Sequence, residues 1–322
     1  MRRHLVARFV QALVVAFFAA TISFVALRSA PGDPFSYSGT DVPPSVRAHW
    51  RHQFGYDRPV LEQYARYVTS VAHGQFGYSF VRGETVGAAL AGALPRTLLL
   101  TGVALGASLA IGVIVGVVQA THRGRWFDRV SSFVLLVFFS LPDFWGALVA
   151  LMIFAYWLPI FPPGGSVDPV MHDYLSGWRA LWDRVSHLIL PASTLTVLTV
   201  AGIARYQRSA MLAALPSDYV RTARAKGVSE TSIIWRHALR TALTPMITLL
   251  GLLFPVLLGG AVFVEKIFSW PGMGLLTTSA ISQRDYDVVT ASVIVGAVTV
   301  AAGSLVADLL QMALDPRVRE RS

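Results

Sequence analysis

Long apolar runs separated by polar segments dominate the pattern of hydrophobic and polar positions along this chain. A helix needs about 20 apolar residues to cross roughly 30 Å of hydrocarbon, and six runs reach that length. The pattern therefore predicts an all-α membrane protein with six transmembrane helices in one transmembrane domain, residues 1–322. The six runs lie near residues 9–29, 97–120, 130–157, 187–209, 243–264 and 288–312.

The first run follows a short basic start, Met-Arg-Arg-His. Secretory signal peptides share that arrangement, but the apolar stretch from Phe9 to Leu27 is longer than a usual signal core. We therefore expect a retained first helix, with a cleaved signal peptide as the alternative.

The polar segment between the first two runs, residues 30–95, is the longest of the chain. Apolar side chains recur at helical spacing over residues 58–72, which predicts an amphipathic helix that packs on the bundle or lies on the membrane surface. The residues on this apolar face are Val60, Tyr64, Tyr67, Val68 and Val71.

Two later polar segments carry tryptophans. Trp178 and Trp182 share one face of a predicted helix, a spacing typical of anchors at the membrane edge. Contact with a partner or substrate is the alternative for these two side chains. Trp270-Pro271-Gly272 predicts a tight turn, followed by a short helix.

Basic residues are unevenly distributed among the polar segments. Sixteen of the 27 Lys and Arg residues lie in the two termini, the loop between the second and third runs, and the 210–242 loop with its approaches. Basic residues concentrate on the cytoplasmic side of membrane proteins. We therefore expect both termini and the 210–242 loop to be cytoplasmic and the 30–95 loop to be external.

The overall composition fits this assignment. Hydrophobic residues make up 54% of the chain and charged residues 14%, against about 25% charged residues in soluble domains. The net charge of +9 follows membrane sidedness, so we expect membrane lipid and proteins as partners and no nucleic acid. The chain has no cysteine, which excludes disulfides, thiolate metal sites and cysteine nucleophiles.

Motifs of catalysis are also missing from the sequence. A phosphate-binding P-loop needs Gly-Lys followed by Ser or Thr, but Lys226 precedes Gly227 and Lys266 precedes Ile267. Neither a His-Glu-x-x-His zinc motif nor a Gly-x-Ser-x-Gly nucleophile motif occurs. The sequence therefore argues against an enzyme and favours a membrane subunit that another protein powers, or a passive pore.

The 210–242 loop contains signals for a short helix that ends at a glycine. Ser217 is placed to cap the helix start, and Asp218 in the first turn complements the helix dipole. Arg224 and Lys226 lie near the other end, where positive charge is favourable. Gly227 suits the left-handed position that follows a helix.

A second short helix is predicted after this glycine, capped by Ser229 and with Glu230 in its first turn. Small residues in the first helix would let another protein approach closely, and its basic residues would supply charge. The alternative is a positive-inside loop that only orients the protein. The candidate docking residues are Ser217, Asp218, Tyr219, Arg221, Thr222, Ala223, Arg224, Ala225, Lys226 and Gly227.

The third apolar run is interrupted at Ser140-Leu141-Pro142-Asp143. Pro142 removes a backbone donor and predicts a kink. Asp143 is costly in hydrocarbon, so we expect it to face the interior and to meet a substrate cation. A local cap of the broken helix is the alternative for Asp143. Ser140, Pro142 and Asp143 are thus candidates for a translocation pathway.

The segment Tyr219–Gly227, Tyr-Val-Arg-Thr-Ala-Arg-Ala-Lys-Gly, followed by Arg236-His237-Ala238-Leu239-Arg240, resembles the coupling loop of permease subunits of ABC importers. It is most similar to the dipeptide/oligopeptide branch. The wider superfamily has Glu-Ala-Ala where this chain has Arg221-Thr222-Ala223, so only the last alanine is kept. That departure is typical of the peptide branch.

Further fragments extend the resemblance over nearly the whole chain, although the family usually has an aspartate where Gln75 stands. These fragments are Pro31-Gly32-Asp33-Pro34, Tyr56-Asp57-Arg58-Pro59 with Gln63-Tyr64, Gly74-Gln75-Phe76-Gly77-Tyr78-Ser79, Pro95-Arg96-Thr97 and His187-Leu188-Ile189-Leu190-Pro191 opening two runs, Arg284-Asp285-Tyr286 and Asp315-Pro316-Arg317.

The resemblance implies the type I ABC importer permease fold, with a core at about residues 95–312, in the cytoplasmic membrane of a prokaryote. It implies a heterodimer with a second homologous permease, two ABC ATPase subunits and an extracytoplasmic substrate-binding protein. ATP and Mg would bind in the ATPases, so we expect no cofactor, metal or catalytic residue in this chain.

The implied function is transport of dipeptides or oligopeptides. The alternatives are a same-family permease for nickel chelates, glutathione, haem or sugars, and a stand-alone carrier or channel.

Overall fold

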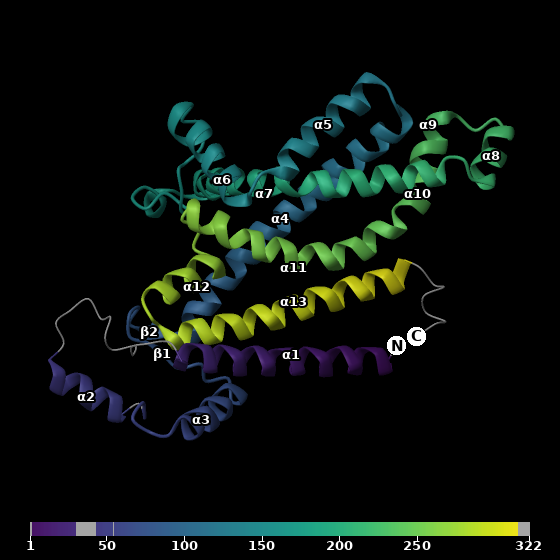
Figure 1. The fold of residues 1–322 in the computed structure, drawn as a ribbon. Coiled ribbons are helices and arrows are strands. Elements are labelled where there is room, and N and C mark those ends of the chain that lie inside the picture. The colour runs from purple at the N-terminus through teal and green to yellow at the C-terminus, as the bar shows by residue number, and fades with distance from the viewer. Residues whose placement is uncertain (1, 30–42, 54, 315–322) are drawn as a thin grey trace. The chain divides into compact units, whose positions relative to one another are not determined.

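A computed structural model describes residues 2–29, 43–53 and 55–314 of the chain (Figure 1). Helices dominate, and the strands of the described part are a short antiparallel pair, β1 (Tyr78–Ser79) and β2 (Glu84–Thr85). The proline-rich turn at 31–34 and the tail motif at 315–317 lie outside the described residues.

The long helices agree with most of the predicted apolar runs. Within the described chain, four helices are long and apolar enough to cross a membrane, and a pair bent by 102° makes up to five. The four are α1 (Arg2–Ser29), α4 (Val86–Thr121), α7 (Gly177–Ala214) and α13 (Tyr286–Leu314), and the bent pair is α5 (Trp126–Ser140) with α6 (Asp143–Leu151). A further helix, α11 (Thr244–Ile267), covers the fifth predicted run, and the count of six spans stays a prediction.

Two helices begin earlier than the sequence predicts. Pro95 and Pro191 were expected to open the second and fourth runs, but both lie inside helices, because α4 starts at Val86 and α7 at Gly177. Proline is tolerated within membrane helices where neighbouring groups satisfy the freed backbone. Each apolar run is therefore preceded by about two to three more helical turns of less apolar sequence.

The chain divides into two compact units, the first made of Met1–His4, Leu98–Trp270 and Ala302–Ser322. In this unit α7 packs against α5, α6 and α11. One apolar core contains Leu100 of α4, Leu190 of α7 and Phe268 after α11. The helix α7 is thus the central support of the unit.

Two glycines let α4 approach α7 closely. A Cβ atom on Gly112 would lie 2.6 Å from Cγ2 of Ile203, and one on Gly116 would lie 2.6 Å from the carbonyl oxygen of Ala204. Small residues four apart are a common device for close helix packing in membranes. Only glycine permits this crossing without a shift of one helix.

A buried ion pair joins α5 to α7. Arg208 donates from Nε to Asp128 Oδ1 and from Nη2 to Asp128 Oδ2, both at 2.9 Å. The Gly124 amide donates to the same carboxylate at 2.9 Å. Asp128 is buried, and bidentate pairing with a further amide bond is the arrangement that a buried carboxylate needs.

The second unit comprises Leu5–Thr97 and Pro271–Ala301. Its core joins Val86 and Leu90 of α4, Leu276 of α12 (Met273–Ser282) and Val288 of α13. The predicted helices at 58–72 and after the Trp270 turn are confirmed as α3 (Val60–Ala72) and α12. A short helix that the hydropathy pattern did not predict, α2 (Pro44–Gln53), lies in the same long loop.

The loop between α6 and α7 is irregular, as its prolines and glycines suggest. A π-helical turn, η2 (Met152–Trp157), ends the bent pair, and a 3₁₀ turn, η3 (His172–Tyr174), follows later. Asp183 of α7 holds this loop by accepting from His172 Nδ1 at 2.6 Å and from the Asp168 amide. Trp178 and Trp182 are both exposed, which agrees with anchoring at a membrane edge and equally with contact with a partner.

The helix crossing generates the first testable prediction. Replacing Gly116 by alanine places a methyl group against the backbone of α7 and should destabilise the protein by about 1–3 kcal/mol. The matched control is Gly106→Ala on the same helix, where a Cβ atom would meet nothing within 4 Å, so the better helix former should leave stability unchanged or raise it by up to about 1 kcal/mol. Thermal unfolding of the purified protein in detergent measures both, and equal midpoints for the two variants contradict the close crossing.

Candidate functional site

The predicted docking segment forms a compact element of short helices after the end of α7. It consists of α8 (Asp218–Ala225), a glycine turn, α9 (Glu230–Ser232), the π-helical turn η4 (Ile233–Ala238) and α10 (Leu239–Ala242). The sequence predicted two helices around Gly227, and the structure has this order (Figure 1).

The start of α8 differs from the prediction in one detail. The Ser217 carbonyl accepts from the amides of Val220 and Arg221, both at 3.1 Å, so Ser217 does occupy the capping position. Its hydroxyl, however, donates to the carbonyl of Ala214 at 2.5 Å instead of accepting from α8. The last carbonyls of α7 lack helical partners, and the tight turn brings the hydroxyl to one of them.

The same correction applies to Ser229. It occupies the capping position of α9, but its hydroxyl makes no capping hydrogen bond in the described chain. Its carbonyl accepts from the Ile233 amide at 2.9 Å. The two serines thus predict the starts of both helices correctly, but the predicted capping bonds of their hydroxyls do not form.

The glycine turn is confirmed. Gly227 has φ +78°, the left-handed conformation that glycine adopts without strain. The Gly227 amide donates to the Arg224 carbonyl at 3.0 Å, and the Val228 amide donates to the Ala223 carbonyl at 3.2 Å. This pair of bonds is the Schellman motif, which fixes the direction in which the chain leaves a helix.

One face of the element is built into the protein itself. Val220, Ala223 and Ile233 are buried in a core with Val117 of α4 and Met211 of α7. The small side chain of Ala223 was expected to admit a partner, and this expectation is wrong because the residue packs inward. Its size lets α8 sit against the ends of the two long helices.

The other face is exposed. Tyr219 is 42% exposed, and Trp235 of η4, which the sequence did not single out, is 43% exposed. A signal for Trp235 was present, since an aromatic residue in a predicted polar loop is unusual away from an interface. The remaining predicted residues on this face are Asp218, Arg221, Thr222, Arg224, Ala225, Lys226 and Gly227.

The charges on this face are not equally available. Arg224 donates to Glu230 through two bonds, Nε to Oε1 at 2.5 Å and Nη2 to Oε2 at 3.1 Å. These bonds raise the pKa of Arg224 and lower the pKa of Glu230. Arg221 lies 3.6 Å from Asp218, and Lys226 makes no ion pair within the described residues. Arg224 therefore closes the turn, while Arg221 and Lys226 present charge outward.

The second candidate site is the break between α5 and α6. Helix α5 ends at Ser140, whose hydroxyl donates to the Leu136 carbonyl at 2.8 Å, and Pro142 is extended at φ −60° and ψ 138°. The predicted kink is confirmed as a complete break with the 102° bend. Asp143 begins α6, where a negative charge is favourable.

Asp143 does not face the interior of this chain. Its side chain is exposed, beside the exposed rings of Phe144 and Trp145. In the described chain it has no hydrogen bond or ion pair, and it does not cap α6. The expectation of an inward-facing carboxylate is therefore wrong for the single chain. Figure 1 shows α6 and α8 well apart along α7, so the structure does not bring the two candidate sites together.

No group of three or more His, Asp or Glu side chains within the described residues is arranged to hold a metal ion.

The chain matches two protein families in sequence. Residues 109–320 match the inner membrane component of binding-protein-dependent transport systems, and residues 1–101 match the N-terminal part of such membrane components. It is 38% identical over 299 residues to the oligopeptide transport system permease protein AppB of Bacillus subtilis, covering 92% of this chain and 93% of that protein. It is also 38% identical over 332 residues to the di/tripeptide transport system permease protein DppB of Pseudomonas aeruginosa, covering 98% of each.

A solved structure supports the fold. A chain of the MetNI methionine ABC transporter in an inward-facing conformation has a TM-score of 0.57 and 19% sequence identity, covering 70% of this chain and 96% of that chain. At this identity the likeness concerns the fold alone. With the matched families and the long apolar helices, these similarities show that the chain belongs to the family of inner membrane components of binding-protein-dependent transport systems and is a multi-pass membrane protein.

Proposed function

We propose that this chain is the permease subunit of an ATP-driven importer for dipeptides or oligopeptides. The names of the relatives support peptide cargo, since AppB and DppB are named for oligopeptides and for di- and tripeptides. Nickel chelates, glutathione, haem or sugars are the alternative cargoes. In this proposal the chain pairs with a second homologous permease, and a substrate-binding protein delivers cargo from outside.

The two-faced element at residues 217–242 carries the proposal. Its exposed face, with Tyr219, Arg221, Lys226 and Trp235, docks on one of two separate ATPase subunits in the cytoplasm. The charge bias of the sequence supports a cytoplasmic position for this loop and both termini. ATP and Mg bind in those subunits, and this chain contributes no catalytic residue.

The buried face gives the element a route to the membrane helices. Val220 and Ile233 pack against Val117 of α4 and Met211 of α7, so α8 moves together with the ends of both helices. Rigid-body switching between two arrangements of packed helices is a common basis of transport and allostery. Closure of the ATPases would thus rock α4 and α7.

Asp143 is the pathway candidate in this proposal. An exposed carboxylate without a partner is costly in a membrane, unless it lines the water-filled space between this chain and the second permease. There it would attract a peptide amino terminus or a cationic side chain. The exposed rings of Phe144 and Trp145 would add an apolar surface beside the charge.

The glycine turn gives a test of coupling. Proline at position 227 cannot adopt φ +78° and lacks the amide that bonds Arg224. We expect Gly227→Pro to insert and to lose at least tenfold of ATP-dependent uptake in proteoliposomes with the partner subunits. The control is Gly227→Asn, since asparagine tolerates the left-handed region, and uptake should stay within about twofold. Normal uptake by the proline variant would contradict the coupling role.

The exposed charges give a test of docking. The double variant Arg221→Glu/Lys226→Glu should lower the amount of ATPase that co-purifies with the permease by at least tenfold, because charge repulsion opposes association. Arg123→Glu is the control, since this exposed arginine lies in a different polar loop. The variant Ala223→Glu should instead lower the yield of folded protein, because it buries a charge in the core. Equal ATPase recovery in the double variant and the control would rule out this docking surface.

The pathway role of Asp143 is tested separately. Asp143→Asn removes the charge and keeps the shape, and we expect peptide uptake to fall at least tenfold while the complex assembles and hydrolyses ATP. Asp173→Asn, an exposed aspartate in the loop before α7, is the control and should transport normally. Unchanged uptake by Asp143→Asn would contradict a role of this carboxylate in the pathway.

A further inference from the structure

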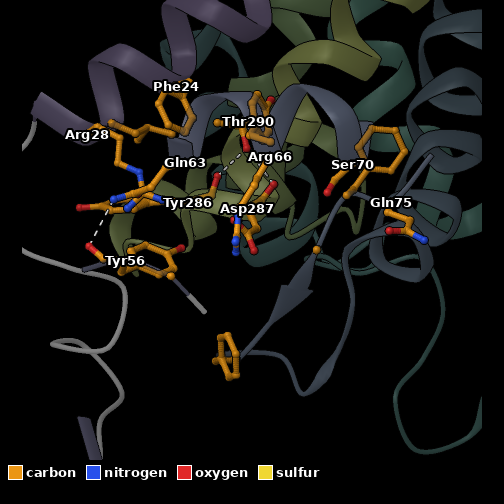
Figure 2. Close-up of a pocket in the computed structure, with 16 residues that line it drawn as sticks. Phe24, Arg28, Tyr56, Gln63, Arg66, Ser70, Gln75, Tyr286, Asp287 and Thr290 are labelled. Atoms are coloured by element: carbon orange, nitrogen blue, oxygen red, sulfur yellow. Dashed lines mark hydrogen bonds between the residues drawn. The ribbon is translucent and has the colours of Figure 1, made fainter. Parts of the chain in front are cut away.

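A cavity of about 350 Å³ lies in the second unit, between the end of α1, helix α3, the turn at Tyr56, the segment around Gly77 and the start of α13. Its volume is at the lower end of the roughly 300–1,000 Å³ typical of small-molecule pockets. None of its lining residues belongs to the two-faced element at residues 217–242 or to the break before α6. Figure 2 shows Arg28, Gln63 and Asp287 gathered around it from three different elements.

A cation is fixed on one wall of the cavity. The Arg28 guanidinium carbon lies 4.1 Å from the ring centre of Tyr56 and 5.4 Å from that of Phe24. Two aromatic contacts orient this guanidinium through cation–π attraction. Arg28 also hydrogen-bonds the Tyr56 side chain. No carboxylate of the described chain lies within ion-pair distance of Arg28, so its remaining hydrogen-bond donors keep capacity for an anion.

An anion lies on another wall. Asp287 is the second residue of α13 and packs against the backbone of Gly77, where an added Cβ atom would lie 2.5 Å from Asp287 Oδ2. Gly77 also has φ +92°, so both its backbone and its lack of a side chain permit this approach. Within the described residues, Asp287 has no basic side chain within 4.0 Å. Arg28 and Asp287 thus face the cavity without a salt bridge between them, although the charge of Arg28 acts on Asp287. The third charged side chain of the lining, Arg66, lies 3.2 Å from Glu62.

Two buried polar atoms in the cavity also lack partners. Gln63 donates from Nε2 to the carbonyls of Arg58 at 2.7 Å and Tyr56 at 3.3 Å, which leaves its buried Oε1 without a donor in the described chain. The buried Tyr67 hydroxyl has no hydrogen-bond partner there either, and the nearby Thr290 hydroxyl donates to the Tyr286 carbonyl. Burial raises the pKa of Tyr67 to about 12, so this phenol keeps its proton.

The walls are held in place before any ligand arrives. Tyr64 of α3 and Thr21 of α1 share a hydrogen bond of 2.7 Å. The Phe24 ring stacks on Tyr67 with centres 5.4 Å apart and meets Tyr64 edge-on at the same distance. These contacts fix α3 on α1 and pre-organise the cavity, which lowers the entropic cost of binding.

We propose that this cavity binds a small zwitterion with separate ammonium and carboxylate groups, of the size of an amino acid or a short peptide. The carboxylate lies at Arg28 and the ammonium group at Asp287. Gln63 Oε1 accepts from the ligand, and the Tyr67 hydroxyl donates to it. A zwitterion fits because it supplies a partner to both charges and to both buried polar atoms, whereas a simple ion leaves one charge unpaired.

The test uses the permease–ATPase complex, purified without the soluble binding protein, and the probe L-alanyl-L-alanine. Isothermal titration should detect binding that weakens at least tenfold for N-acetyl-Ala-Ala, which lacks the ammonium group, and for Ala-Ala amide, which lacks the carboxylate. Arg28→Gln should bind Ala-Ala and its amide equally. Asp287→Asn should bind Ala-Ala and its N-acetyl form equally. A residue with only a structural role would change the binding of Ala-Ala and of the blocked analogues alike, and the difference in affinity between them would remain.

Two further variants separate a site from a folding defect. Ser70→Leu adds bulk to the α3 wall, keeps both charges, and should weaken Ala-Ala binding at least tenfold. Arg82→Gln, whose arginine pairs with Glu84 outside the cavity, should bind as the unaltered protein does. The proposal is overturned if Ala-Ala does not bind at millimolar concentration, if the blocked analogues bind equally well, or if the Arg28 and Asp287 variants lose only thermal stability.

This inference does not depend on the proposed transport function. A complex that carries Gly227→Pro should bind Ala-Ala at this cavity with unchanged affinity. Normal uptake by the proline variant would contradict the coupling role whatever its affinity for Ala-Ala, and a complex that transports but does not bind Ala-Ala would overturn the cavity proposal alone.

Discussion

The close crossing of α4 and α7 at Gly112 and Gly116 is the constraint on which the first unit depends. Backbone atoms of α7 occupy the space that side chains on α4 would fill, so the two helices meet at van der Waals distance over one turn. In a membrane, where apolar burial gives little driving force between helices, such packing is a main source of association. Four other helices of the unit, α5, α6, α10 and α11, pack against α7.

The consequences of the crossing extend along α7 in both directions. Toward its end, Met211 joins Val117 of α4 in the core that receives α8. Nearer its middle, Leu198 packs against Gly146 of α6, where an added Cβ atom would lie 3.2 Å from its side chain. The two-faced element at residues 217–242 and the broken helix therefore have a common support, and a displacement of α7 reaches both. The bidentate Asp128–Arg208 pair adds α5 to the same support.

Patterns of local sequence predicted much of this arrangement. Apolar run length located the long helices, helical spacing located α3, and Gly227 located the turn, because each of these depends on residues close together in the chain. Contacts between distant segments were not predictable in this way. The sequence could not show that Ala223 faces the protein core, since an alanine in a polar loop carries no sign of which side it packs on.

Side-chain choices at helix ends were also beyond the sequence. Ser217 lies within reach of orphan carbonyls of α7 and orphan amides of α8, and the geometry of the intervening turn decides between them. The prolines gave wrong helix starts for a similar reason. Pro95 and Pro191 were expected to begin their helices, but α4 and α7 begin before them. In each case the local signal has two physical solutions, and tertiary packing selects one.

A count of charged residues in the sequence has the same limit. It cannot show which basic residues are neutralised, as Arg208 is by Asp128 and Arg224 by Glu230. The charges without an ion pair in the described chain are the informative ones, because a charge that a partner or the membrane takes out of water needs a compensating group. Lys226 and Asp143 have no ion pair in the described chain, and Arg28 and Asp287 face one cavity without a salt bridge to each other. The proposals above give each place a different source of the opposite charge: a partner protein at Lys226, cargo at Asp143, and a small zwitterion between Arg28 and Asp287.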